Sequence, residues 1–327
     1  MMEKYLLQIS FSLIFILLSA SVIYAETNAD YTLWLNNFKA EAQRAGIKSE
    51  ILNEALSGVK PLDWVIELDR AQPEFTKTLD EYLAGAVNSR RIKEGQRLLA
   101  ENSEILTRIA KRYHIQPRFL MALWGIETSF GLHTGKVPVI DALVTLAYDG
   151  RRGQYFRSEL LNALKILDQG HIKYAQMKGS WAGAMGQVQF MPSTFLNFAV
   201  DGNGDGRIDL WNTRIDYLSS AANYLLKSGW DDTYTWGREV KLPKNLSGEY
   251  FGMQQQHLLS EWQKLGVRAI GGRDLPLVNI LASLIQPDGS KGRAFLVYNN
   301  YRVLMKWNRS HRFAVAVGSL ADRIGEQ

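Results

Sequence analysis

The sequence predicts a mainly α-helical protein of the α+β class, with one small strand-rich subdomain. Apolar residues recur at helical spacing over most of the chain from Tyr31 to Lys227. After Gly229, short apolar runs alternate with Gly, Pro and Asp turns, which is typical of short strands. A chain of 327 residues, 46% of them apolar, is long enough to bury a core by packing alone. We therefore expect one integrated unit.

The first 25 residues have the organisation of a secretory signal. Lys4 supplies a basic start, Leu6 to Leu18 form an apolar stretch, and Ile23-Tyr-Ala25 is a suitable cleavage site. The alternative is an uncleaved anchor, because the stretch from Tyr5 to Ala25 is just long enough to span a bilayer. We expect residues 1–25 to be removed and residues 26–327 to carry no membrane span.

Helices are expected in order up to about residue 228. Apolar stripes such as Leu52, Ala55 and Leu56 recur through the first part of this region. Pro117 then opens a helix, since proline fits the first helical turn. Further helices are expected over Asp141–Ala147 and Ser158–Leu167, from Pro192 onward, and over Ile215–Lys227.

The strand-rich insert is expected at about residues 230–300, and a C-terminal helix at 308–324. Its strand candidates are the apolar and aromatic runs Tyr234–Val240, Pro276–Ile285 and Ala294–Tyr298. The chain ends soon after this helix, so we expect no separate binding module after it.

Composition narrows the possible functions. The 38 basic and 33 acidic residues give a net charge of +5, which suits nucleic acid, a membrane surface or an acidic cell-wall polymer. No run of five Lys or Arg residues occurs, which argues against nucleic acid. The absence of cysteine excludes disulfides, thiolate zinc sites, a cysteine nucleophile and a lipidated N-terminal cysteine.

Glu127 is the first candidate for chemistry. On a helix starting near Pro117 it falls on the same face as Leu120, Leu123 and Trp124. A carboxyl in apolar surroundings has a raised pKa and can keep a proton near neutral pH. That is the property a general acid needs to protonate a glycosidic oxygen. The alternative is a structural Glu that caps the helix or pairs with an arginine.

The segment Gly179–Thr194 is the second candidate. Its small residues between Ala182 and Gly186 allow another chain or a ligand to approach the backbone closely. The amides of Gln187 and Gln189 can bind acetamido groups and sugar hydroxyls. The alternative is a tight loop before a helix, with both Gln side chains on its surface.

The loop from Asp201 to Asp209 resembles the first half of an EF-hand-like calcium loop. Asp201, Asn203 and Asp205 stand at positions 1, 3 and 5, Gly206 stands at the turn, and the Arg207 carbonyl would follow. Position 12 is Asn212 instead of Glu, and Asp216 is the natural substitute. We expect a structural Ca²⁺ and no organic cofactor, and a metal-free Asp/Asn/Gly turn is the alternative.

Together these segments resemble the lytic murein transglycosylase B family, glycoside hydrolase family 103. The resemblance rests on Trp124-Gly-Ile-Glu-Thr-Ser-Phe-Gly131, Gly179–Thr194 and the calcium-type loop before Asn223-Tyr224. It extends to Pro73–Leu79 upstream and Trp307-Asn-Arg-Ser310 downstream. It implies a lysozyme-like catalytic core with a helical subdomain and a small β subdomain.

The resemblance also implies an activity and a set of site residues. Such enzymes cut the β-1,4 bond between N-acetylmuramic acid and N-acetylglucosamine and leave a 1,6-anhydro end. Glu127 would be the acid and base. The implied substrate contacts are Ser180, Gln189, Tyr224, Asn308, Arg151, Arg152 and Tyr82, beside Gln187, and the implied metal ligands are Asp201, Asn203, Asp205, Arg207 and Asp216.

The expected setting is the periplasm, because the signal leads across the inner membrane and no cysteine is available for lipidation. The expected partners are peptidoglycan glycan strands, with other cell-wall enzymes as further candidates and no nucleic acid, and the protein is expected to be a monomer. Phe313 stands where the family commonly has an aromatic hydroxyl, which puts one substrate contact in doubt.

No second carboxylate is found in a recognisable motif opposite Glu127. Asp141, Asp149 and Glu159 are the nearest acidic residues in sequence. Since a glycoside hydrolase normally uses two carboxyl groups, this favours a single-carboxylate mechanism. The alternatives are a hydrolytic muramidase and a non-catalytic, calcium-stabilised wall-binding protein.

Overall fold

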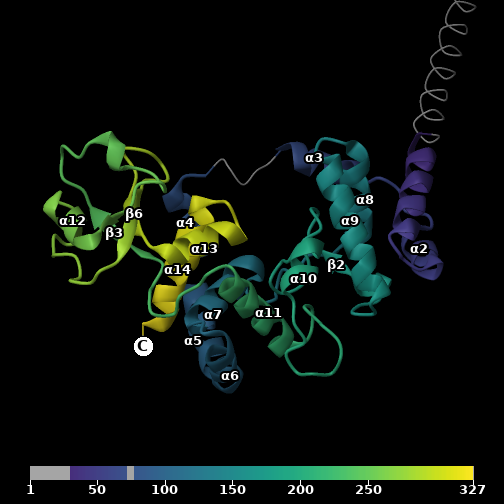
Figure 1. Cartoon of the computed structure of the whole chain (residues 1–327), viewed down its shortest axis with the longest axis horizontal. Helices are drawn as coiled ribbons and strands as arrows, with labels where there is room; N and C mark the ends of the chain where they lie inside the picture. Colours follow the sequence, from purple (N-terminus) through teal and green to yellow (C-terminus); the bar gives the residue numbers. More distant parts are fainter. Residues whose placement is uncertain (1–29, 72–76, 327) are drawn as a thin grey trace, which may run out of the picture.

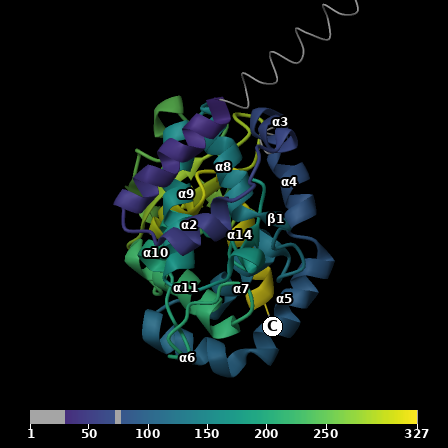
Figure 2. The same ribbon diagram turned by 90° about the vertical axis from the view of Figure 1, so that its right-hand side faces the viewer.

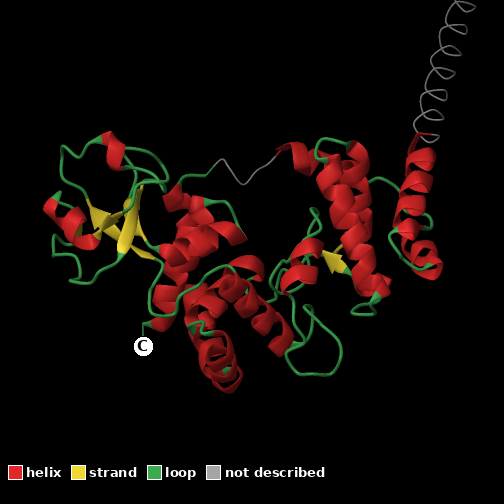
Figure 3. Ribbon diagram, in the orientation of Figure 1, coloured by secondary structure: helices red, strands yellow, loops and turns green. Residues whose placement is uncertain are grey.

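The computed structural model describes residues 30–71 and 77–326. These residues are mainly helical, with one five-stranded and one two-stranded sheet (Figures 1 and 3). The predicted fold class is confirmed. The predicted signal at residues 1–25 and most of the Pro73–Leu79 segment lie outside the described residues. No helix within the described ranges is long and apolar enough to cross a membrane.

A helical subdomain lies at one end of the molecule. A helix at residues 30–44 is followed by α2 (Ser49–Leu56) and α3 (Asp63–Ala71). These pack beside α8 (Val139–Asp149) and α9 (Gly153–Asp168), as both ribbon views show (Figures 1 and 2). The ring of Trp34 stacks on Phe38 and meets Tyr148 edge-on, so aromatic side chains join the first helix to α8.

The central helical region is built around α7 (Pro117–Thr128). Seven consecutive residues of α7, from Phe119 to Gly125, are buried, because α5 (Ser89–Glu101) and α14 (His311–Gly325) pack on it. The remaining helices here are α4 (Leu79–Ala86), α6 (Ser103–Tyr113), α11 (Arg214–Lys227) and α13 (Asn299–Trp307). The predicted start of α7 at Pro117 is confirmed.

Short elements connect the helical subdomain to this centre. β1 (Val137–Pro138) pairs with β2 (Lys178–Gly179), which follows the 3-10 turn Tyr174–Gln176. The helix α10 (Pro192–Phe198) begins at Pro192, as predicted, and packs against α9 and α11.

The β subdomain is one antiparallel sheet with the strand order β4-β6-β7-β3-β5. Its strands are β3 (Gly237–Lys241), β4 (His257–Leu258), β5 (Arg268–Ala269), β6 (Leu281–Ile285) and β7 (Ala294–Val297). β3, β6 and β7 fall in the three predicted strand runs. The short helices Gly248–Tyr250 and α12 (Leu259–Lys264) lie between strands, and the buried Trp262 of α12 packs in a separate small core.

The C-terminal helix expected at 308–324 is confirmed as α14, which begins three residues later than predicted, and a further helix that was not expected precedes it. The structure has two helices, α13 and α14, separated at residues 308–310. Asn308 is extended, and the Ser310 hydroxyl accepts the Phe313 N–H at 3.3 Å to start α14. The helix α13 was missed: it has only nine residues and begins two residues after the end of β7, so its apolar positions give a short periodic signal.

Candidate active site

Glu127 lies in the last turn of α7, beside a buried apolar face. Leu120 and Leu123 are fully buried and Trp124 nearly so, whereas Glu127 is half-buried. The helix ends one residue later, at Thr128, and the next residue, Ser129, adopts a left-handed conformation and donates its N–H to the Gly125 carbonyl at 3.1 Å. The fold therefore carries the Glu127 carboxyl at the end of a rigid, buried helix.

An indole group holds this carboxylate. The Nε1–H of Trp307, at the end of α13, donates to Glu127 Oε1 at 2.6 Å. The Trp307 ring in turn meets Tyr224 of α11 at 4.8 Å and Phe190 at 5.3 Å between centroids. Residues from four separate parts of the chain, Glu127, Phe190, Tyr224 and Trp307, are thus linked through one indole ring. Aromatic faces and a carboxyl group are the usual components of a sugar-cleaving site.

The Gly179–Thr194 segment folds into a tight hairpin-like loop, with bridges from Met185 to Gly179 and to Phe190. Its small residues are needed for the approach of another part of the backbone. A Cβ on Gly179 would lie 2.1 Å from the Ala184 carbonyl oxygen, and one on Gly186 would lie 2.5 Å from that of Leu210. The close approach predicted here is therefore made by the protein chain itself.

The polar side chains of this segment differ in how they are used. Gln187 is engaged at both ends of its amide: Oε1 accepts the Trp124 indole N–H at 2.7 Å and Nε2 donates to the Trp211 carbonyl at 2.9 Å. Gln189 donates from Nε2 to the Thr134 and Gly186 carbonyls. Ser180 Oγ accepts the N–H groups of Ala182 and Ala184. Gln187 therefore has a structural role, whether or not it also meets substrate.

Tyr224 contacts the Trp307 ring, and Asn308 follows Trp307 in the chain. Tyr224 is largely buried, and burial raises the pKa of its phenol. Asn308 is exposed and follows Trp307 directly, with its backbone N–H bonded to the Leu304 carbonyl at 3.0 Å. Phe313, the departure noted above, is buried in the first turn of α14.

Arg151 and Arg152 both form salt bridges with the buried Asp69. Arg151 Nε contacts Asp69 Oδ2 at 2.5 Å, and Arg152 bonds the other carboxylate oxygen. These hydrogen bonds, led by that from Arg151, hold the pKa of Asp69 below its usual value. The pair thus ties the turn between α8 and α9 to α3, while about 40% of each arginine side chain stays exposed (39% and 44%).

Tyr82 lies on α4, half-buried and near Arg91. Arg91 Nη1 donates to the Gly85 and Ala86 carbonyls at the end of α4, and Nη2 donates to Ser129 Oγ at 3.0 Å. One guanidinium therefore connects the helix of Tyr82 to the end of the Glu127 helix. Sequence reasoning did not single out Arg91, and it quoted Trp307 only within a family segment. Arg91 and Trp307 both contact residues that are distant in the chain, and local periodicity gives no indication of such contacts.

The three acidic residues considered as a second carboxylate have other partners. Glu159 is buried and accepts from the N–H and hydroxyl of Ser193, at 2.8 and 2.6 Å. Asp141 accepts from the Tyr174 hydroxyl at 3.2 Å, and burial raises its pKa. Asp149 pairs with Arg70 at 2.9 Å. Each of these contacts gives the acidic residue a structural role in the fold.

In the predicted calcium loop, the Asp carboxylates accept hydrogen bonds from backbone N–H groups of the same loop. Asp201 accepts the N–H groups of Gly204 and Gly206 at 2.6 and 2.7 Å, and both glycines have positive φ. Asp205 accepts from Arg207 N–H at 2.8 Å. Among the described residues no three His, Cys, Asp or Glu side chains form a metal group, so a cation would also need Asn203 and the Arg207 carbonyl.

Asp216 supports the fit of a cation to this loop. It is fully buried at the start of α11, and its two oxygens accept the backbone N–H groups of Gly202 and Asp209, each at 2.9 Å. Burial raises its pKa, and the nearby charges of Asp201 and Asp205 raise it further. A hard divalent cation suits such a set of oxygen donors.

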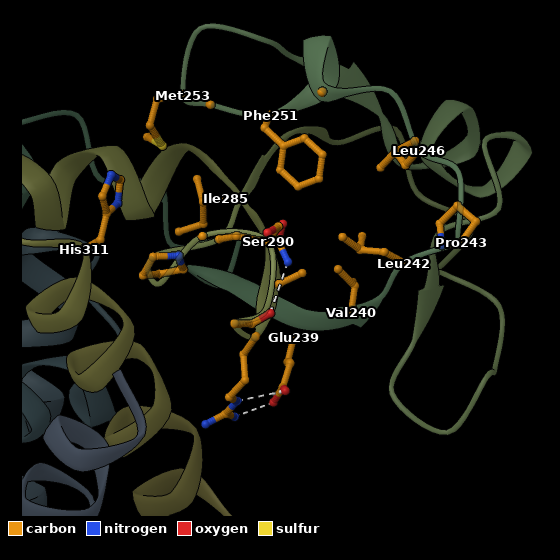
Figure 4. Close-up of a pocket in the computed structure, with 18 of the residues that line it drawn as sticks. Glu239, Val240, Leu242, Pro243, Leu246, Phe251, Met253, Ile285, Ser290 and His311 are labelled. Carbon is orange, nitrogen blue, oxygen red and sulfur yellow. Dashed lines mark hydrogen bonds and ion pairs between the residues drawn. The ribbon is translucent and has the colours of Figure 1, made fainter. Parts of the chain in front are cut away.

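A pocket of about 860 Å³ lies in the β subdomain, apart from this site (Figure 4). Figure 4 shows Leu242, Phe251 and Ile285 around it, with Glu239 at one side in an ion pair with Arg293. None of its lining residues comes from α7 or from the Gly179–Thr194 segment.

Comparisons with known proteins identify the family of this chain. Residues 30–322 match the family model described as Transglycosylase SLT domain. The chain is 30% identical over 293 residues to membrane-bound lytic murein transglycosylase B of Escherichia coli K12, covering 85% of this chain and 79% of the relative.

Two solved structures extend the comparison. SltB3 of Pseudomonas aeruginosa, in complex with NAG-anhNAM-pentapeptide, has a TM-score of 0.87 and 42% identity, covering 90% of this chain and 80% of that one. SLT35 of Escherichia coli, in complex with calcium, has a TM-score of 0.76 and 28% identity, covering 89% of this chain and 92% of that one. The predicted family is therefore confirmed: this chain belongs to the lytic transglycosylases of the Transglycosylase SLT domain family.

Proposed function

We propose that this protein cleaves the β-1,4 bond between N-acetylmuramic acid and N-acetylglucosamine in peptidoglycan, with Glu127 as the single acid and base. The observation that carries the proposal is the half-buried Glu127 carboxyl, bonded to the indole of Trp307, whose ring meets Tyr224 and Phe190. It agrees with the family and with the NAG-anhNAM-pentapeptide complex of SltB3.

The proposed reaction needs no water. Glu127 gives its proton to the bridging oxygen, the bond from C1 of the muramic acid breaks, and N-acetylglucosamine leaves as an alcohol. The substrate's N-acetyl group, or backbone dipoles together with Ser180, stabilises the positive charge at C1. The Glu127 carboxylate then takes the proton of the C6 hydroxyl, whose oxygen bonds C1 to close the 1,6-anhydro ring.

The partners of Asp141, Asp149 and Glu159 support a mechanism with one carboxyl group. Each of these residues is engaged by Tyr174, Arg70 or Ser193. A hydrolase would instead need a second carboxyl group to activate water or attack the sugar. With Glu127 alone, the internal C6 hydroxyl is the nucleophile that the mechanism favours.

Mass spectrometry of the soluble products from purified sacculi tests the proposal. Muropeptides lighter by one water, about 18 Da, are expected, because ring closure replaces the addition of water. Reducing ends would show a hydrolytic muramidase instead. The absence of any product, with calcium present, would favour the non-catalytic wall-binding protein.

We also propose that the loop binds a structural Ca²⁺ through Asp201, Asn203, Asp205, the Arg207 carbonyl and Asp216. The buried Asp216 beside two other carboxylates supports this, as does the calcium complex of SLT35. Such an ion would fix the loop to the start of α11, which carries Tyr224 nearby. No step of the reaction requires it.

Removal of calcium is expected to lower the melting temperature. Without calcium, the loop is held only by its own hydrogen bonds, whereas a bound ion stabilises the folded state. Differential scanning fluorimetry should therefore show a higher Tm in Ca²⁺ than in EGTA. Asp201→Asn should reduce this difference, and Asp274→Asn, an exposed change in the β subdomain, should leave it intact. Equal Tm values for the wild type in Ca²⁺ and EGTA would contradict the site.

The cellular setting is part of the same proposal. A periplasmic enzyme acting as a monomer on glycan strands fits the predicted signal and the family, with other cell-wall enzymes as candidate partners. Detection of the protein in the periplasmic fraction, shortened by residues 1–25, is the expected result. A full-length protein in the membrane fraction would indicate the uncleaved anchor.

A further inference from the structure

A second pocket lies directly beside the end of the Glu127 helix. It has a volume of about 740 Å³ and lies between the first turns of α5 and the loop after α7. We call it the α5 pocket, and its lining residues are Ser89, Arg90, Lys93, Glu94, Arg97, Ser129, Phe130 and Leu132. Ser129 follows Glu127 by two residues, so one wall of the pocket is formed by the loop at the end of the helix that carries the proposed acid.

The loop that forms one wall is held in an uncommon conformation. Ser129, Phe130 and Gly131 all have positive φ, at 51°, 60° and 89°. Such backbone persists only where surrounding contacts over-determine it. Here Arg91 donates to Ser129 Oγ, and the Thr128 hydroxyl accepts the Gly131 N–H at 3.0 Å. The wall therefore has a defined position relative to Glu127.

The packing of α5 supports the same wall. Phe130 meets Trp124 edge-on at 5.5 Å and fills the space above two glycines. A Cβ on Gly95 of α5 would lie 3.2 Å from the Phe130 ring, and one on Gly125 of α7 would lie 2.7 Å from it. Since both helices are in close contact with this ring, α5 and the loop form one rigid concave surface.

The other wall is positively charged. Arg90, Lys93 and Arg97 face a single carboxylate, Glu94. Arg97 is occupied, because it pairs with Glu94 at 2.6 Å and with Glu101. Arg90 and Lys93 form no salt bridge with any residue in the described ranges. Leu132 adds an apolar contact, with 67% of its surface exposed. The pocket thus combines two available cations with an apolar side chain.

We propose that the α5 pocket binds a carboxylate of the peptide attached to N-acetylmuramic acid while Glu127 acts on the glycan. This inference rests on the proposed function. The amino end of that peptide is used in its bond to the sugar, so its free end is a carboxylate. A NAG-NAM-pentapeptide fragment of the kind bound by SltB3 carries its negative charge on this peptide.

The peptide is long enough to extend from the sugar at Glu127 to the α5 pocket. Five extended residues span about 17 Å at ~3.4 Å per residue. The pocket begins two residues from Glu127, whose carboxyl must contact the sugar that carries the peptide. The cations would act at the charged end, and Leu132 would contact aliphatic side chains along the peptide.

The test compares two soluble substrates, a NAG-NAM-pentapeptide tetrasaccharide and the same tetrasaccharide without peptide. The double variant Arg90→Ala/Lys93→Ala is expected to raise KM for the pentapeptide substrate about 3- to 10-fold, because two exposed charge contacts are lost. Its kcat should stay unchanged. Its KM for the peptide-free substrate should equal that of the wild type. Added salt should reduce the difference.

The matched control is Lys241→Ala/Lys264→Ala, which removes the same charge from exposed positions of the β subdomain. It should leave both KM values unchanged. An equal loss on both substrates would overturn the proposal, as would no change on either. If the wild type cleaves neither substrate, the proposed function fails. In that case, calorimetry measures the Kd of NAG-anhNAM-pentapeptide for the wild type and for the Arg90/Lys93 double variant. A weaker Kd in the variant would support the α5 pocket as the binding site, and an equal Kd would overturn it.

Discussion

At the scale of single residues, Glu127 depends on a partner far away in the chain. Trp307 donates its indole N–H to the carboxylate from 180 residues downstream. This hydrogen bond fixes the direction of the carboxyl group, while the indole ring packs on Phe190 and Tyr224. The same side chain therefore orients the proposed acid and forms part of the aromatic wall.

Glu127→Gln is expected to reduce the release of muropeptides from sacculi by about 10²- to 10⁴-fold, the usual contribution of a general acid. The amide oxygen can still accept the Trp307 N–H, so the fold should persist. Circular dichroism and Tm serve as the control. A variant that keeps more than a small fraction of activity would show that Glu127 is not the acid.

Two substitutions separate the roles of Trp307. Trp307→Phe keeps an aromatic ring and removes the donor, so kcat should fall about tenfold, the value of one hydrogen bond to a charged group, with KM nearly unchanged. Trp307→Leu should lower kcat and also raise KM, because the aromatic wall is lost. Steady-state kinetics on soluble glycan strands distinguishes them. Wild-type kcat in Trp307→Phe would contradict a positioning role.

At the scale of elements, α7 is joined to the Gly179–Thr194 segment by Gln187. Its amide bonds Trp124 and Trp211, and its carbonyl accepts the Thr128 hydroxyl at 2.9 Å. The helix that carries Glu127 is thus fastened to the loop that carries Ser180 and Gln189. The relative placement of these proposed site residues follows from this contact.

Gln187→Ala is expected to lower the free energy of unfolding by about 1–3 kcal/mol, because the buried Trp124 N–H loses its acceptor. Urea denaturation followed by Trp fluorescence measures the change. Gln254→Ala, at an exposed position of the β subdomain, is a matched control and should change stability little. If both variants are equally stable, the contact with Trp124 contributes nothing to the fold.

At the scale of the whole molecule, Asp69 joins the helical subdomain together. It receives Arg151 and Arg152 from the α8–α9 turn, and its own side chain is almost fully buried. Because the folded pKa of Asp69 lies below its unfolded value, the contribution of its charge to stability is present above about pH 3.9. That contribution is lost as the pH falls through the folded pKa.

Asp69→Asn is expected to lower the free energy of unfolding by about 1–3 kcal/mol at pH 7, a value reduced by the partial exposure of both arginines. The deficit should shrink as the pH falls below about 3.9 toward the folded pKa, because the wild type then loses its charge. Asp149→Asn, at the pair with the exposed Arg70, should cost less than about 1 kcal/mol. A deficit for Asp69→Asn that is constant with pH would contradict this account.

Local sequence patterns determined most of the elements of this protein. The Pro117 helix, the Pro192 helix, α11 and the three main strands follow from periodicity and turn residues, because burial of one face imposes a repeat on the nearby sequence. Glu127 and the Asp201 loop were also predicted from short segments, since the expected chemistry of each depends on a few consecutive residues, and both stay predictions.

Only the tertiary structure decided which residues meet. The bond from Trp307 to Glu127, the bridge of Arg91 to Ser129 and the pairing of Asp69 with two arginines all join distant parts of the chain. The same is true of Gln187, whose amide was expected at substrate and is bound within the protein. Periodicity reports which side of an element is buried, but not which element covers it, because that choice is made by packing of the whole chain.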